Sequence, residues 1–278
     1  MKHHVLLSIL FFGGLSSCLP ATAQTTTSTS TAPTAPDYTA LEQSAIKGDK
    51  QALDQLQSDA GAGIADAQLH LGDFYLINQQ YDQSMFWLQR AAGNGSVQAQ
   101  NAIGDCYYNG LGVTQSIPNA AKWYRKAADS GYAIAELNLG ALYHDGNGIP
   151  QDFIQAVYWY VRAAEQGNPV AENDLGYCYE HGQGVTQDNK RAFGWYQKSA
   201  LNDYPMGQYN TGMMYAAGAG TPQNYKMAAY WFNKSADAGI GDAALALAGM
   251  YSRGLGVPHD SGKAEYWAAQ AEKDGDKN

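Results

Sequence analysis

From residue 67 onward, apolar residues recur three or four positions apart, in short blocks divided by polar or glycine-rich segments. This spacing predicts amphipathic helices, because residues three and four apart share one face of a helix. Blocks like residues 135–146 (AELNLGALYHDG) alternate with blocks that contain a tryptophan. We call the first kind helix A and the second kind helix B. Their alternation predicts a chain of paired helices.

The pattern has a fixed period. Each helix A carries a glycine near its middle, the core glycine, and a tyrosine follows it three residues later. The tryptophans lie 36 residues apart, at Trp87, Trp123, Trp159, Trp195, Trp231 and Trp267. The core glycines are Gly72, Gly104, Gly140, Gly176 and Gly212, and Ala248 takes the place of the last. Because these series keep a common register, the sequence predicts six tandem repeats.

Residues with known preferences for helix ends mark the boundaries. Helix A is expected to open at alanine 67, 99, 135, 171 or 243, or at Gly207, and to close at glycine 110, 146, 182, 218 or 254. Helix B is expected to start after a capping side chain: Ser116, Asp152, Asp188, Asn224 or Asp260. A glycine inside a helix costs about 1 kcal/mol relative to alanine. We therefore expect each core glycine to allow close approach of helix B.

The segment before the repeats has a different composition. Residues 1–23 are predicted to be a signal peptide, with a positive start, an apolar run and small residues at Ala21 and Ala23. An alternative remains open, because Leu15 to Cys18 resembles a lipobox, which makes Cys18 a possible lipidation site. The predicted organisation continues with a Thr/Ser/Pro-rich flexible linker at 24–37, an N-terminal helical cap at 38–66 and six repeats at 67–278.

The charge balance narrows the range of partners. The formal net charge is −9, and no basic cluster is present. Nucleic acid is therefore excluded as an expected partner, and a membrane is expected only through a lipid anchor at Cys18. Cys106 and Cys178 stand at equivalent positions with one whole repeat between them. We expect two buried thiols there, because the separation exceeds the reach of a disulfide.

Candidate chemistry is sparse, and we assign no catalytic, cofactor-binding or metal-binding residue. Ser44 to Lys47 has the form S-x-x-K but lacks a K-T-G partner. His144-Asp145 and Glu180-His181 occupy neighbouring repeats and could approach one another around a metal. No ligand spacing requires such a site, so solvated loop histidines are the preferred interpretation. The sequence therefore predicts a protein that is not an enzyme.

The repeat unit resembles the SEL-one-like repeat (SLR), which is related to the tetratricopeptide repeat. The resemblance extends over about residues 67–273 and is closest over 135–167 and 171–200. It implies an all-α fold, a right-handed α-solenoid of helix-turn-helix repeats with a concave inner surface. Proteins of this family mostly act as adaptors, and many bacterial members are exported. The resemblance thus implies an exported, periplasmic or secreted scaffold that binds a protein or peptide.

Two positions in each helix A vary between repeats and share one face: two residues before and one after the core glycine. We call them the inner-face positions, since the resemblance implies that they line the concave surface. The predicted partner-binding residues there are His70, Asp73, Asp105, Asn138, Asp174, Tyr177, Asn210 and Met213. Asn138, Asp174 and Asn210 would form a ladder for a peptide backbone. The alternatives are an envelope factor for peptidoglycan-related material and a host-interaction factor that acts through its convex face.

Overall fold

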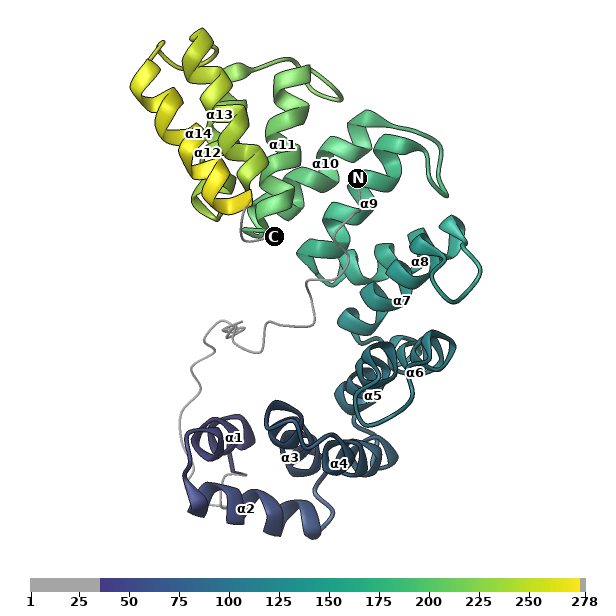
Figure 1. Ribbon diagram of the computed structural model, residues 1–278. Coiled ribbons are helices and arrows are strands. Elements are labelled where there is room, and N and C mark those ends of the chain that lie inside the picture. The colour runs from purple at the N-terminus through teal and green to yellow at the C-terminus, as the bar shows by residue number, and fades with distance from the viewer. Residues whose placement is uncertain (1–35, 276–278) are drawn as a thin grey trace, which may run out of the picture. The chain divides into compact units, whose positions relative to one another are not determined.

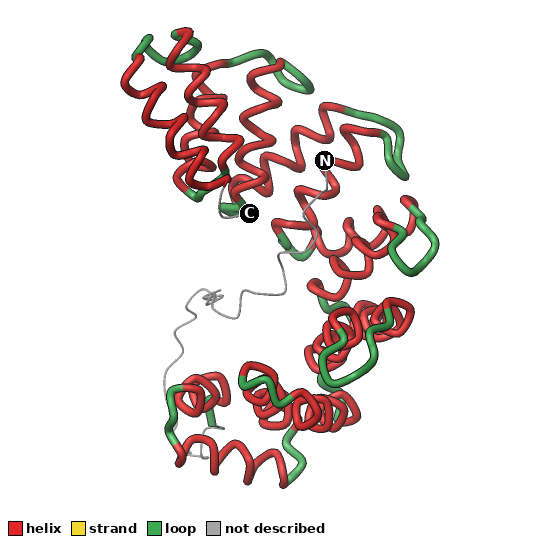
Figure 2. Tube along the Cα trace, in the orientation of Figure 1, coloured by secondary structure: helices red, strands yellow, loops and turns green. Residues whose placement is uncertain are grey.

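The computed structural model describes residues 36–275, which form helices joined by turns and loops (Figures 1 and 2). This range contains fourteen helices and no strand, so the predicted all-α solenoid of helix-turn-helix repeats is confirmed. The predicted signal peptide, Cys18 and most of the predicted linker lie outside the described residues. No described helix is both long and apolar enough to span a bilayer.

The described chain divides into two compact units between Trp123 and Tyr124, within helix α6 (Ile117–Asp129). The first unit contains the segment predicted as a cap, which folds into two helices, and the helices that follow it (Figure 1). Its helices are α1 (Tyr38–Ile46), α2 (Lys50–Gly61), α3 (Ala65–Ile77), α4 (Tyr81–Gly93) and α5 (Val97–Asn109).

The second unit alternates A and B helices of nearly equal length. They are α7 (Ala133–Asp145), α8 (Phe153–Glu165), α9 (Pro169–His181), α10 (Asn189–Leu201), α11 (Pro205–Ala217), α12 (Tyr225–Asp237), α13 (Gly241–Arg253) and α14 (Ser261–Gly275). Each A helix packs against the B helix that follows it, and each B helix packs against the next A helix. Helices α9 and α11 also contact each other directly, as do α1 and α3 in the first unit.

The helix ends follow the predicted signals with one correction. Each A helix starts two residues before the position predicted from the alanines, so that Ala135 and Ala171 lie fully buried inside the first turn. The five closing glycines adopt the left-handed conformation, with φ from +66° to +72°. The predicted caps of helix B are also confirmed. Asp152 Oδ1, for example, accepts hydrogen bonds of 3.0 Å from the backbone N–H groups of Ile154 and Gln155.

The core glycines bring helix B close, as predicted. A Cβ atom at Gly140 would lie 2.7 Å from Cδ1 of Tyr160, and one at Gly176 would lie 2.7 Å from Cδ1 of Tyr196. The contacting ring belongs to the residue after the tryptophan, and both tyrosine rings are almost fully buried. Since real Cβ atoms do not approach other atoms so closely, glycine is required at these positions.

Small residues near the end of helix B receive the next repeat. Ala163 and Ala164 of α8 pack against Ala171 and Leu175 of α9 in one continuous apolar cluster. Cys178 belongs to the same cluster, and Cys106 is buried in the equivalent cluster of the first unit. Both cysteines are free, as predicted, and burial raises the pKa of each thiol to about 12. These thiols therefore act as small apolar side chains rather than nucleophiles.

A buried polar side chain stands four residues before most core glycines: Gln68, Gln100, Glu136, Glu172 and Gln208. Residues near the end of helix B satisfy several of them. Gln166 Nε2 donates to Glu136 Oε2 at 2.7 Å, and Asn202 Nδ2 donates to Glu172 Oε2 at 2.9 Å. Glu136 is fully buried and also lies 2.8 Å from Nε of Arg162. These contacts tie the start of helix A to the end of helix B within one repeat.

The second glycine of four long loops, Gly112, Gly184, Gly220 and Gly256, touches the preceding repeat. Gly184 and Gly220 have φ of +70° and +69°. A Cβ at either position would overlap the carbonyl group of the first residue of the preceding B helix, Phe153 or Asn189. Gly112 and Gly256 are in the same situation. Gly148 also has a positive φ, +74°, so an alanine there would be strained.

We expect Gly220→Ala to lower the free energy of unfolding by about 3 kcal/mol, combining a left-handed backbone with a backbone clash. The matched control is Gly239→Ala, because Gly239 has φ +90° and open space around its Cα. The control should cost only about 1 kcal/mol, from the backbone conformation alone. Urea denaturation measures both. Equal losses of stability in the two variants would mean that the close contact of Gly220 with the carbonyl group of Asn189 does not contribute to the effect.

Candidate functional site

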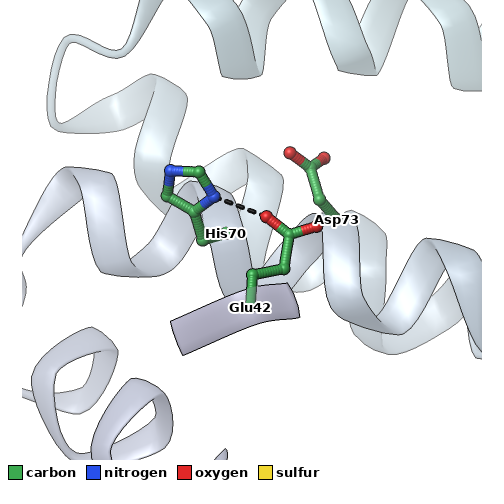
Figure 3. A group of neighbouring side chains, drawn as sticks. All are labelled: Glu42, His70 and Asp73. Carbon is green, nitrogen blue, oxygen red and sulfur yellow. Dashed lines mark hydrogen bonds and ion pairs between the residues drawn. The ribbon is translucent and has the colours of Figure 1, made fainter. Parts of the chain in front are cut away.

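The inner-face positions of the first unit gather charged side chains on α3 and α5. His70 and Asp73 lie on α3, Asp105 lies on α5, and all three are partly exposed. Glu42 of α1 joins them, because its Oε2 accepts a 2.5 Å hydrogen bond from His70 Nδ1. Figure 3 shows Glu42 of α1 close to His70 and Asp73 of α3. We call these three residues the cap cluster.

The surroundings of the cap cluster disfavour the charged form of the Asp73 side chain. Burial and the nearby carboxylates of Glu42 and Asp105 raise the pKa of Asp73 to about 7, against a smaller opposing effect of His70. Burial lowers the pKa of His70, but its hydrogen bond to Glu42 and the surrounding negative charges outweigh this, so the net shift is upward. Negative charge therefore accumulates here and favours a bound positive charge.

In the second unit, a chain of hydrogen bonds joins two of the predicted ladder residues. Asn210 Nδ2 on α11 donates to Asn173 Oδ1 on α9 at 2.8 Å, and Asn173 Nδ2 donates to Asp174 Oδ1 at 3.2 Å. Asn173 is buried, whereas Asn210 and Asp174 are partly exposed. Asn138 holds the equivalent position on α7 and is also partly exposed. The structure thus links neighbouring repeats through Asn173, which sequence reasoning missed.

An aromatic and imidazole cluster lies beside this chain. The rings of His144 and Tyr177 approach edge to face with centroids 6.1 Å apart, and Tyr177 stacks on His181 at 4.0 Å. His144 Nδ1 lies 3.0 Å from Asp145 Oδ1 and His144 Nε2 lies 2.9 Å from Gln183 Oε1, both within hydrogen-bond distance. The interpretation of His144 as a solvated loop histidine was therefore wrong. The residue lies in the last turn of helix α7, and both of its ring nitrogens have partners.

The charges of this cluster favour an imidazolium beside a carboxyl group. The hydrogen bond to Asp145 raises the pKa of His144 more than burial lowers it. Burial raises the pKa of Asp174 to about 6, although Asn173 and His144 act in the opposite direction.

Met213, one repeat further on, is 44% exposed. The inner-face positions of this unit therefore combine hydrogen-bonding groups with an apolar contact.

A second surface feature lies on the B helices, where the residue before the tryptophan is often aromatic. Phe86, Tyr158, Tyr230 and Tyr266 are all at least half exposed. Each ring packs edge to face on the neighbouring tryptophan. Arginine or lysine side chains lie over several of them, such as Arg90 over Phe86 at 4.8 Å. We call these four residues the B-helix aromatic positions.

Stacked pairs of antiparallel helices, without strands in the described residues, define an α-solenoid of two-helix repeats. The Sel1 repeat matches six consecutive segments: residues 65–96, 97–132, 133–168, 169–204, 205–240 and 241–276. The chain belongs to the Sel1 repeat family. The predicted resemblance and the number of repeats are thereby confirmed. Proteins of this kind are generally protein-interaction scaffolds and are typically non-enzymatic.

Two solved structures are similar over most of the chain. A protective antigen present in uropathogenic Escherichia coli strains, which displays an SLR fold, is 38% identical with a TM-score of 0.76. The similarity covers 80% of this chain and 49% of that structure, so this chain spans about half of its length. A Sel1 repeat protein from Oxalobacter formigenes is 34% identical with a TM-score of 0.69, covering 73% and 84% of the two chains.

A curated protein is similar over a shorter stretch. The DAP3-binding cell death enhancer 1 of Rattus norvegicus is 34% identical over 77 residues, which is 26% of this chain and 15% of the rat protein. This similarity extends over a small part of that protein.

Proposed function

We propose that this protein is an exported scaffold that binds an extended segment of a protein or peptide along the inner-face positions of its A helices. The observation that carries the proposal is the hydrogen-bonded chain from Asn210 through Asn173 to Asp174. It holds an amide and a carboxyl group at partly exposed positions on adjacent repeats. Amide and carboxylate groups at regular intervals are suited to pair with the N–H and C=O groups of an extended backbone.

Apolar and aromatic groups beside the chain support the same function. Tyr177 and Met213 lie one residue after the core glycines of α9 and α11. Binding surfaces use such side chains for contact area and polar neighbours for orientation. The proposal includes export through residues 1–23, with lipidation of Cys18 as the alternative route to the envelope. The similarity to a protein described as a protective antigen supports a location outside the cytoplasm.

We expect Met213→Glu to weaken partner binding at least tenfold without loss of stability, since a half-exposed methionine accepts a charge in the folded state but not in an apolar contact. The measurement is quantitative capture from envelope and medium fractions, followed by titration of the captured partner. The triple variant Asn138→Ala, Asp174→Ala, Asn210→Ala should abolish capture.

The matched control is Tyr158→Glu on helix α8, which places the same charge at a B-helix aromatic position of similar exposure, 50% against 44% for Met213. Binding that survives Tyr158→Glu and fails in Met213→Glu supports the inner-face site. The reverse pattern would assign binding to the B helices, in agreement with a host-interaction factor that uses its convex face. Capture of peptidoglycan fragments in place of protein would favour the envelope alternative.

A further inference from the structure

The cap cluster places three metal-ligating side chains within reach of one another. One ligand atom from each of Glu42, His70 and Asp73 lies within 4.8 Å of the other two (Figure 3). Glu42 comes from α1, whereas His70 and Asp73 come from one turn of α3. Glu42 is 8% exposed, so the cluster lies at the packed interface between these helices and not on an open acidic surface.

The Glu42–His70 hydrogen bond accounts for only two of the three side chains. The Asp73 side chain forms no hydrogen bond or ion pair with any described residue, and no lysine or arginine of the described chain pairs with Glu42. A partly buried carboxylate next to two others is costly unless something positive compensates it. If the Glu42–His70 hydrogen bond served only as a structural pin, that is, only to hold α1 against α3, Asp73 would have no role.

We propose that Glu42, His70 and Asp73 bind a divalent transition-metal ion, with Zn²⁺ as the best-suited ion. Imidazole nitrogen and carboxylate oxygen are both zinc ligands, and three protein ligands leave the fourth tetrahedral position open. Nitrogen donors favour zinc and its neighbours over Mg²⁺ and Ca²⁺, which prefer oxygen alone. The metal adds to the proposed function and does not depend on it.

Only a small rearrangement is needed. Ligand atoms in a tetrahedral zinc site lie about 3.4 Å apart, since zinc–ligand distances are about 2.0–2.2 Å. Asp73 has no hydrogen bond to break, so rotation of its side chain can bring its oxygen closer. The ion takes the place of the proton that His70 Nδ1 shares with Glu42, and that proton leaves to solvent. A fourth position remains for water or for a donor group of a bound partner.

The test is a Zn²⁺ titration of the purified, untagged full chain against a chromophoric chelator at neutral pH, with thermal unfolding as a second readout. The wild type should bind one ion per chain more than Asp73→Asn, and Zn²⁺ should raise its Tm. Asp73→Asn and Glu42→Gln should weaken binding at this site at least tenfold and remove the Tm shift. Both variants keep the side-chain shape, so the fold is preserved.

The matched control is Asp66→Asn, which removes the same charge from an exposed position on the same helix α3. It should bind Zn²⁺ like the wild type. Equal stoichiometry, affinity and Tm response in the wild type and Asp73→Asn would overturn the proposal and leave a simple Glu42–His70 pin. A wild type that binds Mg²⁺ as tightly as Zn²⁺ would also overturn it, because such binding does not involve the imidazole. The test requires no partner, so it is independent of the proposed scaffold function.

Discussion

Gly140→Leu is expected to lower the free energy of unfolding by about 3 kcal/mol. Its Cβ alone would lie 2.7 Å from Cδ1 of Tyr160 and 3.3 Å from the carbonyl oxygen of Ala156. Tyr160 is 1% exposed and belongs to a cluster of buried apolar residues. The rest of the leucine side chain must then push α7 and α8 apart, and overpacking of this kind costs about 1–3 kcal/mol or more. Urea denaturation followed by tryptophan fluorescence measures the loss.

The matched control is Gly194→Ala, at a glycine that also lies inside a helix, α10. Nothing lies within 4 Å of a Cβ at Gly194. Alanine should therefore stabilise the protein by about 0.5–1 kcal/mol through helix propensity alone. Opposite signs for the two variants would establish that helix contact, not helix propensity, keeps glycine at position 140. Stability unchanged by Gly140→Leu would contradict that role.

The second large effect is expected from Arg162→Met, which removes the ionic partner of a fully buried carboxyl group. We expect a loss of about 2–3 kcal/mol at pH 7.5, less than for a fully buried pair because the Arg162 side chain is 32% exposed. Burial raises the pKa of Glu136 even in the wild type, against the opposing effects of Arg162 and Gln166. Without Arg162 that pKa must rise further.

The sign of the pH dependence follows from this upward shift. A carboxyl group with a raised pKa holds its proton more tightly in the folded state, so stability falls as pH rises through the interval between the unfolded and folded values. The Arg162→Met loss should therefore shrink near pH 3.5, where Glu136 is largely protonated in both states, since an unperturbed glutamate has a pKa of about 4.3. Urea denaturation at the two pH values measures this. A loss equal at both would mean that packing, not charge, makes Arg162 important.

Other repeats of the same chain suggest the control for this prediction. Glutamine stands at the position equivalent to Glu136 in three other repeats, as Gln68, Gln100 and Gln208. In a background of Glu136→Gln, the substitution Arg162→Met should cost little at either pH. The neutral amide still accepts the hydrogen bond from Gln166, and no buried charge remains to be compensated.

Most of the fold was predictable because the same sequence signals recur in the repeats, so that a signal that is weak in one repeat is supported by the others. One helix cap is a weak signal, but Asp152, Asp188 and Asp260 at the same place in successive repeats are a strong one. The start of helix A was misplaced by two residues, since Ala135 is buried by packing and does not mark an end. The division of the cap segment into two helices was not predicted, because α1 and α2 lack the core glycine and the tryptophan that mark the repeats.

The site was less predictable than the fold, for a physical reason. The predicted partner-binding residues stand at positions that vary between repeats. The residues that contact them stand at positions that the sequence analysis did not predict as part of a site. Glu42 belongs to the cap, Asn173 was not considered, and His144 was treated as a loop residue. Such contacts depend on how neighbouring helices are placed in space. The contact of α1 with α3, which resembles that of α9 with α11, is the signal that would have found Glu42.

The loop glycines that press on the preceding B helix have a consequence for cooperativity. Gly184, Gly220 and Gly256 join each of their repeats to the one before it at a second place, besides the apolar interface. Nearest-neighbour coupling of this kind makes adjacent repeats melt together. The turn between α3 and α4 is shorter than the loops of the other repeats and contains no glycine. The cap is coupled to the array through side-chain packing, the Glu42–His70 pair and hydrogen bonds such as that from Gln68 Nε2 to the carbonyl oxygen of Ala60 at 3.0 Å. We therefore expect unfolding to start at the cap.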